Sequence, residues 1–197
     1  MRIILGSQSP RRRELMAGLD IPFECTIIDS SENYPPNLQG GDIPAYISRE
    51  KAQAYLPQLK KDELLITADT IVWLEHQMLG KPKDEEDACR MLHLLSGKTH
   101  QVFTGVTFTQ LNAKSDTIVD QTDVTFRPLS EEEILHYVHT YRPLDKAGAY
   151  GIQEWIGYVG VERMNGSYFN VMGFPIERVY LYLKEHQLLP GNKFHQS

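Results

Sequence analysis

The chain has 197 residues, 41% of them hydrophobic and 23% charged, and a formal net charge of -6. This length suits one domain with a substantial core, and the negative charge argues against a general affinity for nucleic acid or anionic membranes. Only two cysteines are present, Cys25 and Cys89, so neither a disulfide framework nor a cysteine zinc site is expected. No stretch approaches the ~20 apolar residues of a membrane span, and the N-terminus lacks a signal-peptide pattern. We expect a single domain over residues 1–197, soluble and cytoplasmic.

A serine- and arginine-rich stretch follows the short apolar run at residues 3–6. It predicts a strand, a loop and then a helix that starts with Ser9 as N-cap and Pro10 at the first helical position and continues through Leu19. Successive arginines in a first turn add to the positive end of the helix dipole, so this turn needs an anion such as phosphate. The alternative is a solvated basic face on an ordinary surface helix, but the serines and the proline favour anion binding. The candidate ligands are Ser7, Ser9, Arg11, Arg12 and Arg13.

The next informative stretch is apolar and β-branched, and it predicts a buried strand over residues 64–74. A short strand at 23–28, a proline-rich polar loop at 29–41 and a helix at 43–56 precede it, and His76-Gln77 is predicted as a hairpin turn after it. Asp69 lies in the middle of this strand. A buried carboxylate needs a cation, a metal, hydrogen-bond donors or an opening onto water. A catalytic role and a purely structural one therefore carry equal weight here.

The second half alternates helices and strands. We predict helices at 84–95, 130–141 and 176–186, strands at 99–109, 117–126 and 159–163, and a type I′ turn at Asn165-Gly166. The helix at 130 starts with a capping box, Ser130 to Glu133. His100 has no cysteine or histidine near it in sequence and is interpreted as structural, while the small residues of 144–153 predict a tight loop around a ligand or a turn. The alternation predicts an α/β fold with a mixed, twisted sheet flanked by helices.

The N-terminal motif Ser-x-Ser-Pro-Arg-Arg resembles the signature of the Maf family of nucleoside triphosphate pyrophosphatases. Further matches are Ala68-Asp69-Thr70, Gly80-Lys81-Pro82 and the loop from Asp145 to Gln153. The resemblance implies two lobes with a central cleft, in a Maf/ITPase-like shape. It also implies that Asp69 is the general base, that Lys51 and Lys81 face the triphosphate, and that Glu32 contacts a divalent metal, Mg²⁺ or Mn²⁺, or water. The family commonly has aspartate where this chain has Ser31.

The same resemblance bears on which nucleobase the substrate carries. In the dTTP/UTP branch of the family, arginine follows the motif proline, threonine follows the catalytic aspartate and glutamine ends the later loop; Arg11, Thr70 and Gln153 match all three. The 7-methyl-GTP branch has tryptophan at the first of these positions, which suits stacking on a cationic purine. The implied reaction is hydrolysis of dTTP and UTP to the monophosphate and pyrophosphate, in house-cleaning of the nucleotide pool. The alternatives are a hydrolase of modified nucleotides and a non-catalytic nucleotide-binding regulator of cell division, and a homodimer is left open.

Overall fold

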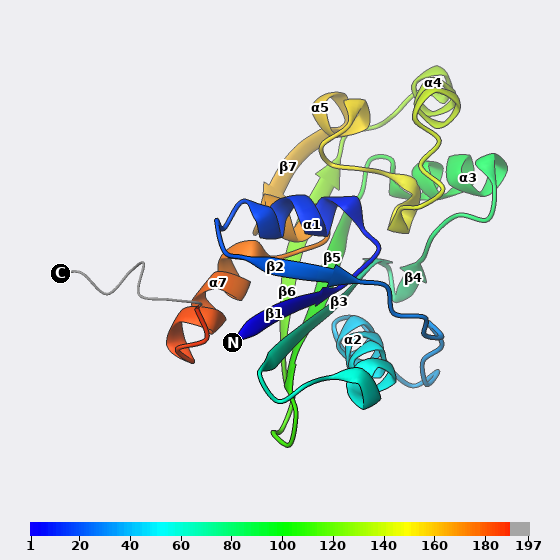
Figure 1. Cartoon of the computed structure of the whole chain (residues 1–197). Helices are drawn as coiled ribbons and strands as arrows, with labels where there is room; N and C mark the ends of the chain where they lie inside the picture. The colour runs from blue at the N-terminus through cyan, green and yellow to red at the C-terminus, as the bar shows by residue number, and fades with distance from the viewer. Residues whose placement is uncertain (190–197) are drawn as a thin grey trace.

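The computed structural model describes residues 1–189, in which strands and helices alternate along the chain (Figure 1). The strands are β1 (Arg2–Gly6), β2 (Phe23–Thr26), β3 (Glu63–Leu74), β4 (Gln77–Leu79), β5 (Thr99–Gln110), β6 (Asp116–Phe126) and β7 (Val161–Asn165). The helices are α1 (Pro10–Ala17), α2 (Asp42–Tyr55), α3 (Glu85–Leu95), α4 (Glu131–Tyr141), α5 (Trp155–Gly160), α6 (Tyr168–Met172) and α7 (Ile176–Glu185), with short 3-10 turns at Leu56–Gln58 and Ala147–Ala149. None of the helices within residues 1–189 has the length and apolar character needed to span a membrane.

All the described strands join one mixed sheet, in the order β2-β1-β3-β5-β6-β7, with β4 added to the end of β3. β1 runs parallel to both β2 and β3, whereas β3, β5, β6 and β7 pair antiparallel in turn. The register of β1 against β3 ends at Gly6 opposite Thr67. Asp69 therefore stands just beyond the carboxyl end of β1, a place where open α/β sheets often bind ligands. The predicted mixed sheet flanked by helices is confirmed.

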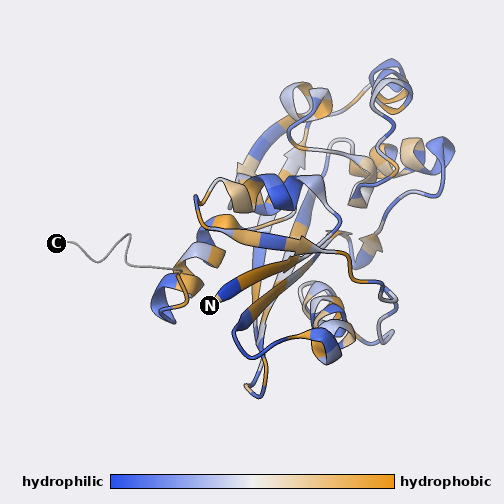
Figure 2. Ribbon diagram, viewed as in Figure 1, coloured by the Kyte–Doolittle hydropathy of each residue, from blue (hydrophilic) through white to orange (hydrophobic). Residues whose placement is uncertain are grey.

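Two large apolar clusters lie at different ends of the sheet. One is formed by β1, β3, β5, α1 and α7 and includes Met16, while the other is formed by α3, α4 and residues 147–156 with the far ends of β3, β5 and β6. Figure 1 shows α3, α4 and α5 gathered at one end, and Figure 2 shows β1 and β3 as strongly hydrophobic strands. Burial of these surfaces is the main driving force for folding.

Local sequence signals account for most helix starts. Ser9 caps α1 by accepting a hydrogen bond from the Arg12 backbone N–H, and Pro10 occupies the first helical position, as predicted. The capping box that joins Ser130 and Glu133 is confirmed at the start of α4.

Four local predictions were wrong. The strand predicted at 159–163 begins two residues later, at Val161, because residues 159 and 160 belong to α5. The first helix ends at Ala17, before the predicted Leu19, because the chain turns there toward Asp20, whose φ is 55°. The hairpin after β3 turns one residue earlier than predicted, since the left-handed residues are Glu75 and His76. No type I′ turn forms at Asn165-Gly166, and the chain continues into α6.

Gly166 is instead needed for a close approach. Its φ is 129°, and a Cβ there would meet the Thr122 Oγ1 atom at 2.7 Å. The short helices α5 and α6 were not predicted, because they have only 6 and 5 residues and too few turns to show a helical period. The sequence after Pro190 predicts a loose tail, which lies outside the described residues.

Gly105 lets α2 lie directly on the sheet. It pairs with Asp69 across the β3–β5 ladder, and a Cβ at this position would lie 2.5 Å from the Pro44 carbonyl carbon and 2.6 Å from the Ala45 nitrogen. Contacts this short do not occur in folded proteins. The missing side chain therefore sets how closely α2, which carries Lys51, approaches the strand that carries Asp69.

Candidate active site

A cavity of about 530 Å³ opens between the two large apolar clusters. All of the predicted site residues except one line it: Ser7, Ser9, Arg11, Arg12, Glu32, Lys51, Asp69, Thr70, Lys81 and Gln153. These residues come from the β1–α1 turn, the first turn of α1, the loop before α2, α2 itself, β3, the segment after β4 and the loop before α5. The exception is Arg13, which is exposed and does not line the cavity. The structure thus brings together most of what the motifs predicted.

Asp69 and Lys51 form the best-buried ion pair of the cavity. The Lys51 Nζ atom lies 2.7 Å from Asp69 Oδ1, and the two side chains are 14% and 11% exposed. Asp69 is fixed by the β3–β5 ladder, and Lys51 by the packing of α2 on β3 and β5. Since both partners stand on regular elements, this is the most rigidly placed pair of opposite charges in the cavity.

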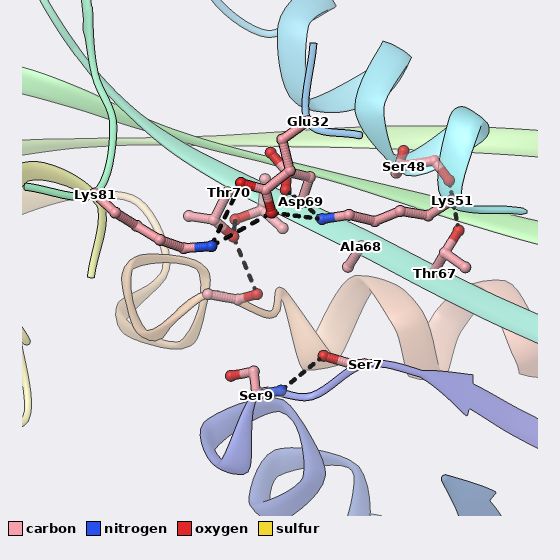
Figure 3. Close-up of polar contacts among 12 residues, drawn as sticks. Ser7, Ser9, Glu32, Ser48, Lys51, Thr67, Ala68, Asp69, Thr70 and Lys81 are labelled. Atoms are coloured by element: carbon pink, nitrogen blue, oxygen red, sulfur yellow. Dashed lines mark hydrogen bonds and ion pairs between the residues drawn. The ribbon is translucent and has the colours of Figure 1, made fainter. Parts of the chain in front are cut away.

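Glu32 lies between two lysines. Its carboxylate is 3.4 Å from Lys51 Nζ and 3.3 Å from Lys81 Nζ, and Figure 3 shows the two lysine side chains approaching it from opposite directions. Partial burial raises the pKa of Glu32, but the charges and hydrogen bonds of Lys51 and Lys81 outweigh that effect, so the pKa lies below its usual value. Glu32 is therefore a carboxylate at neutral pH.

The carboxylates of Glu32 and Asp69 both contact the Lys51 ammonium, so one cation is already accommodated between them. Among residues 1–189, no three histidine, cysteine or acidic side chains come together as a cage made of protein alone would require. Mg²⁺ commonly takes one or two carboxylates from the protein and completes its shell with water and substrate phosphates. The residues present therefore fit a hard divalent cation that arrives with a phosphate ligand.

The arginines of α1 differ in their surroundings. Arg12 donates from Nε to the Gly173 carbonyl, from one terminal nitrogen to the Ala68 carbonyl and from the other to Thr70 Oγ1. Burial lowers its pKa from the usual value, although the charge of Asp69 opposes this. Arg12 thus ties α1 to β3 and to the segment after α6, and its predicted role as a phosphate ligand stays a prediction.

Two of the three residues predicted to select the nucleobase have protein partners. Arg11 pairs with Asp145 at 3.2 Å, and the Thr70 hydroxyl lies 2.9 Å from that of Thr104. The Oε1 atom of Gln153 is buried without a hydrogen-bond partner in the described part of the chain. A buried acceptor that lines a cavity and lacks a partner is suited to a donor on a ligand.

The family model described as "Maf-like protein" matches residues 2–186. The chain belongs to this family.

Curated relatives are similar in sequence to this chain along nearly its whole length. A protein of Bacteroides thetaiotaomicron, named dTTP/UTP pyrophosphatase, is 56% identical over 186 residues, which covers 93% of this chain and 95% of the relative. Proteins of the same name from Phocaeicola vulgatus and Flavobacterium psychrophilum are 54% and 50% identical, over 93% and 94% of this chain and 95% and 94% of their own.

Solved structures resemble the fold at low identity. The Ham1 protein of Staphylococcus aureus has a TM-score of 0.54 at 13% identity and covers 94% of this chain and 100% of its own. A HAM1 protein of Coxiella burnetii has a TM-score of 0.52 at 14% identity and covers 94% of this chain and 99% of its own. These likenesses support the predicted Maf/ITPase-like architecture.

Sequence reasoning missed three charged residues of this Maf-like chain. Asp145 and Lys146 line the cavity, and Lys146 pairs with Glu154 next to Gln153. The first two were seen only as part of a tight loop that matches a family motif, and no role was given to them, because a motif shows which residues are present and not which of them pair. The usable signal was a lysine among small residues in a segment predicted to be closely packed.

Proposed function

We propose that this chain is a nucleoside triphosphate pyrophosphatase that hydrolyses dTTP and UTP to the monophosphate and pyrophosphate. The observation that carries the proposal is the convergence of Lys51, Lys81, Asp69 and Glu32 in one cavity. Relatives that are 50 to 56% identical over most of the chain and are named dTTP/UTP pyrophosphatase support it. Ammonium groups alone would suit a binding protein, whereas carboxylates beside them provide for the attack of water.

The lysines would receive the triphosphate. Lys51 is held close to Asp69, while the Lys81 side chain is 55% exposed and free to follow the substrate. Phosphate oxygens that approach these lysines would compete with the Glu32 carboxylate for the same ammonium groups. The lysines would then stabilise the negative charge that develops on the leaving pyrophosphate.

Asp69 would orient the attacking water and take its proton. One carboxylate oxygen, Oδ1, accepts the hydrogen bond from Lys51, and we assign the other to the water. The oxygen of that water forms a bond to the α-phosphorus while the bond from phosphorus to the α,β-bridging oxygen breaks. The electron pair of that bond leaves with pyrophosphate, and the water proton passes to the Asp69 carboxylate.

Glu32 would hold a divalent cation together with the substrate phosphates. When bound, such an ion neutralises phosphate charge and orients the phosphoryl groups. The residues of the chain would provide the remaining contributions: binding of the phosphates, placement of the water and acceptance of its proton.

The test is an assay of pyrophosphate release with Mg²⁺ and, in turn, dTTP, UTP, CTP and 7-methyl-GTP. Release from dTTP and UTP in preference to the others supports the proposal. Preference for 7-methyl-GTP would replace it with a hydrolase of modified nucleotides. Tight binding of UTP without any pyrophosphate would replace it with a nucleotide-binding regulator.

A further inference from the structure

A row of alternating charges runs from α1 to the loop before α5. The Arg11 guanidinium lies 3.2 Å from Asp145 Oδ2, and Asp145 Oδ1 lies 2.7 Å from Lys146 Nζ. Lys146 Nζ then lies 3.1 Å from Glu154 Oε1. Every charge in this row therefore has an opposite charge beside it.

The inner end of the row is largely buried, and its groups have hydrogen-bond and ion-pair partners. The Lys146 side chain is 10% exposed and that of Glu154 is 20% exposed. The second Glu154 oxygen accepts a hydrogen bond from the Tyr137 hydroxyl, which in turn accepts one from the Gly151 backbone N–H at 3.0 Å. Removing one member would leave a buried charge unpaired, which is costly, so these groups hold each other in place.

The row connects parts of the molecule that have separate cores. Arg11 stands on α1, whose buried Met16 belongs to one apolar cluster, whereas Tyr137 and Ile152 belong to the other. Arg11, Asp145 and Lys146 all line the cavity. The Arg11–Asp145 pair therefore joins two walls of the cavity that do not share a hydrophobic core.

Gln153 is packed against the end of this row. It precedes Glu154 directly, and a Cβ added at Gly151 would lie 2.9 Å from the Glu154 carboxyl carbon and 3.1 Å from Gln153 Nε2. The two side chains thus crowd the same backbone atom. A change in the position of Glu154 would displace the Gln153 amide, whose Oε1 atom has no partner in residues 1–189.

We propose that Asp145, Lys146 and Glu154 are positioning residues that hold Arg11 and Gln153 at a fixed separation and thereby set the preference for uracil and thymine over cytosine. This inference rests on the proposed function. An amide offers one acceptor and one donor edge, which matches the N3–H donor and O4 acceptor of uracil. Cytosine presents the reverse pattern, with an amino donor at position 4. Discrimination therefore depends on an amide that cannot shift or turn.

The experiment measures the preference in two ways, as the ratio of kcat/KM for UTP over CTP and as the ratio of affinities for UMP over CMP by calorimetry. In Asp145→Asn, both ratios should fall about tenfold, which corresponds to the loss of one well-placed hydrogen bond. The conservative Asp145→Glu should restore most of the preference. A matched control is Asp120→Asn, which removes the carboxylate of an aspartate–arginine pair that lies outside the cavity.

A second variant protects the test against misfolding. The double variant Lys146→Met/Glu154→Gln removes a buried pair together and leaves no single charge unpaired. It should keep a cooperative thermal transition and lose the preference for uracil. Unchanged UTP/CTP and UMP/CMP ratios in both variants would overturn the inference.

The monophosphate measurement separates this inference from the proposed function. A wild-type protein that prefers UMP over CMP, loses that preference in Asp145→Asn and releases no pyrophosphate would disprove hydrolysis and uphold the positioning role. A wild-type protein that binds UMP and CMP equally would overturn the inference even if it hydrolyses UTP.

Discussion

Asp69 and Glu32 contact the same ammonium group, but the chain holds the two carboxylates in different ways. Asp69 belongs to a strand paired along its length with β5, and its side chain is 11% exposed. Glu32 belongs to the irregular loop between β2 and α2, and its side chain is 49% exposed. The strand thus fixes one charge before any ligand arrives, while ion pairs alone place the other.

The difference assigns different tasks to the two groups. A proton acceptor must stay within hydrogen-bond reach of a water, so it gains from a rigid strand. A group that exchanges lysine partners for a metal and phosphates must move, so a position on a loop suits it better than one on a strand. We therefore expect substitutions of Asp69 to reduce the rate of the chemical step. Substitutions of Glu32 should chiefly change how the activity depends on the concentrations of Mg²⁺ and substrate.

The largest effect is expected for Asp69→Asn. Loss of the proton acceptor should lower kcat by roughly 10²- to 10⁴-fold, because general base catalysis contributes this much in enzymes. The measurement is steady-state release of pyrophosphate from UTP, with thermal unfolding to show that the fold is kept. Full activity in a folded Asp69→Asn protein would exclude Asp69 as the base.

A smaller effect is expected for Glu32→Gln. The loss of one ligand to a divalent cation should lower kcat/KM by about 10- to 100-fold and raise the Mg²⁺ concentration needed for half-maximal activity. Glu75→Gln is a suitable control, since Glu75 pairs with Lys98 outside the cavity. If the Mg²⁺ dependence of Glu32→Gln matches that of the control, Glu32 does not hold the metal.

The loop at residues 143–154 allows a third test, because a buried histidine fixes it to the sheet. His100 Nε2 lies 2.7 Å from the Tyr150 hydroxyl, and burial lowers the pKa of His100 from 6.5 to about 3, against an opposing effect from the charge of Asp123. Below pH 6.5 the His100 imidazole is therefore protonated in the unfolded chain but stays neutral in the folded chain until the pH approaches 3. Stability linked to His100 is complete above pH 6.5 and is lost as the pH falls toward 3.

Between pH 6.5 and pH 5 this loss should reach about 2 kcal/mol in the wild-type protein. His100→Phe should lack this component, although it leaves the Tyr150 hydroxyl without its partner at every pH. Urea unfolding at several pH values measures both slopes. Parallel curves for the two proteins would show that His100 does not titrate between the folded and unfolded states in this range.

The smallest effect is expected at α4, which contributes no side chain to the cavity lining. Ser130→Ala removes the N-cap hydrogen bond to the Glu133 backbone N–H and should cost about 1 kcal/mol of the free energy of unfolding. The rate of pyrophosphate release at 25 °C should stay unchanged. A drop in rate would mean that the activity depends on global stability. The different roles assigned to Asp69 and Glu32 would then need another explanation.

Much of the fold could be predicted because local signals and tertiary packing agree. Caps at Ser9 and Ser130 and the apolar run of β3 place their elements correctly. The short helices α5 and α6 could not be predicted, since 6 and 5 residues are too few to show a helical period, and α6 is also held by a side-chain contact distant in sequence. Asn170 of α6 donates its side-chain amide to the Val102 carbonyl on β5.

The site residues could be predicted where a motif includes them. Their roles could be predicted less well where these depend on which side chains contact one another in the folded protein. The motifs placed Asp69, Lys51 and Lys81 in one cavity. They gave no indication that three protein oxygens surround the Arg12 guanidinium, or that Arg13 faces away from the cavity. Neighbours in a run of arginines point in different directions around a helix, and only the packing of that helix decides which of them faces the ligand.

The bare α-carbon of Gly105 has a consequence for the electrostatics at Asp69 on the neighbouring strand. A single methyl group there would act as a wedge under Pro44 and tilt the helix that carries Lys51, about two turns further along. The ammonium would then withdraw from Asp69 although no charged group had been altered. The distance between the opposite charges in the cavity is thus set by an uncharged residue that has no side chain.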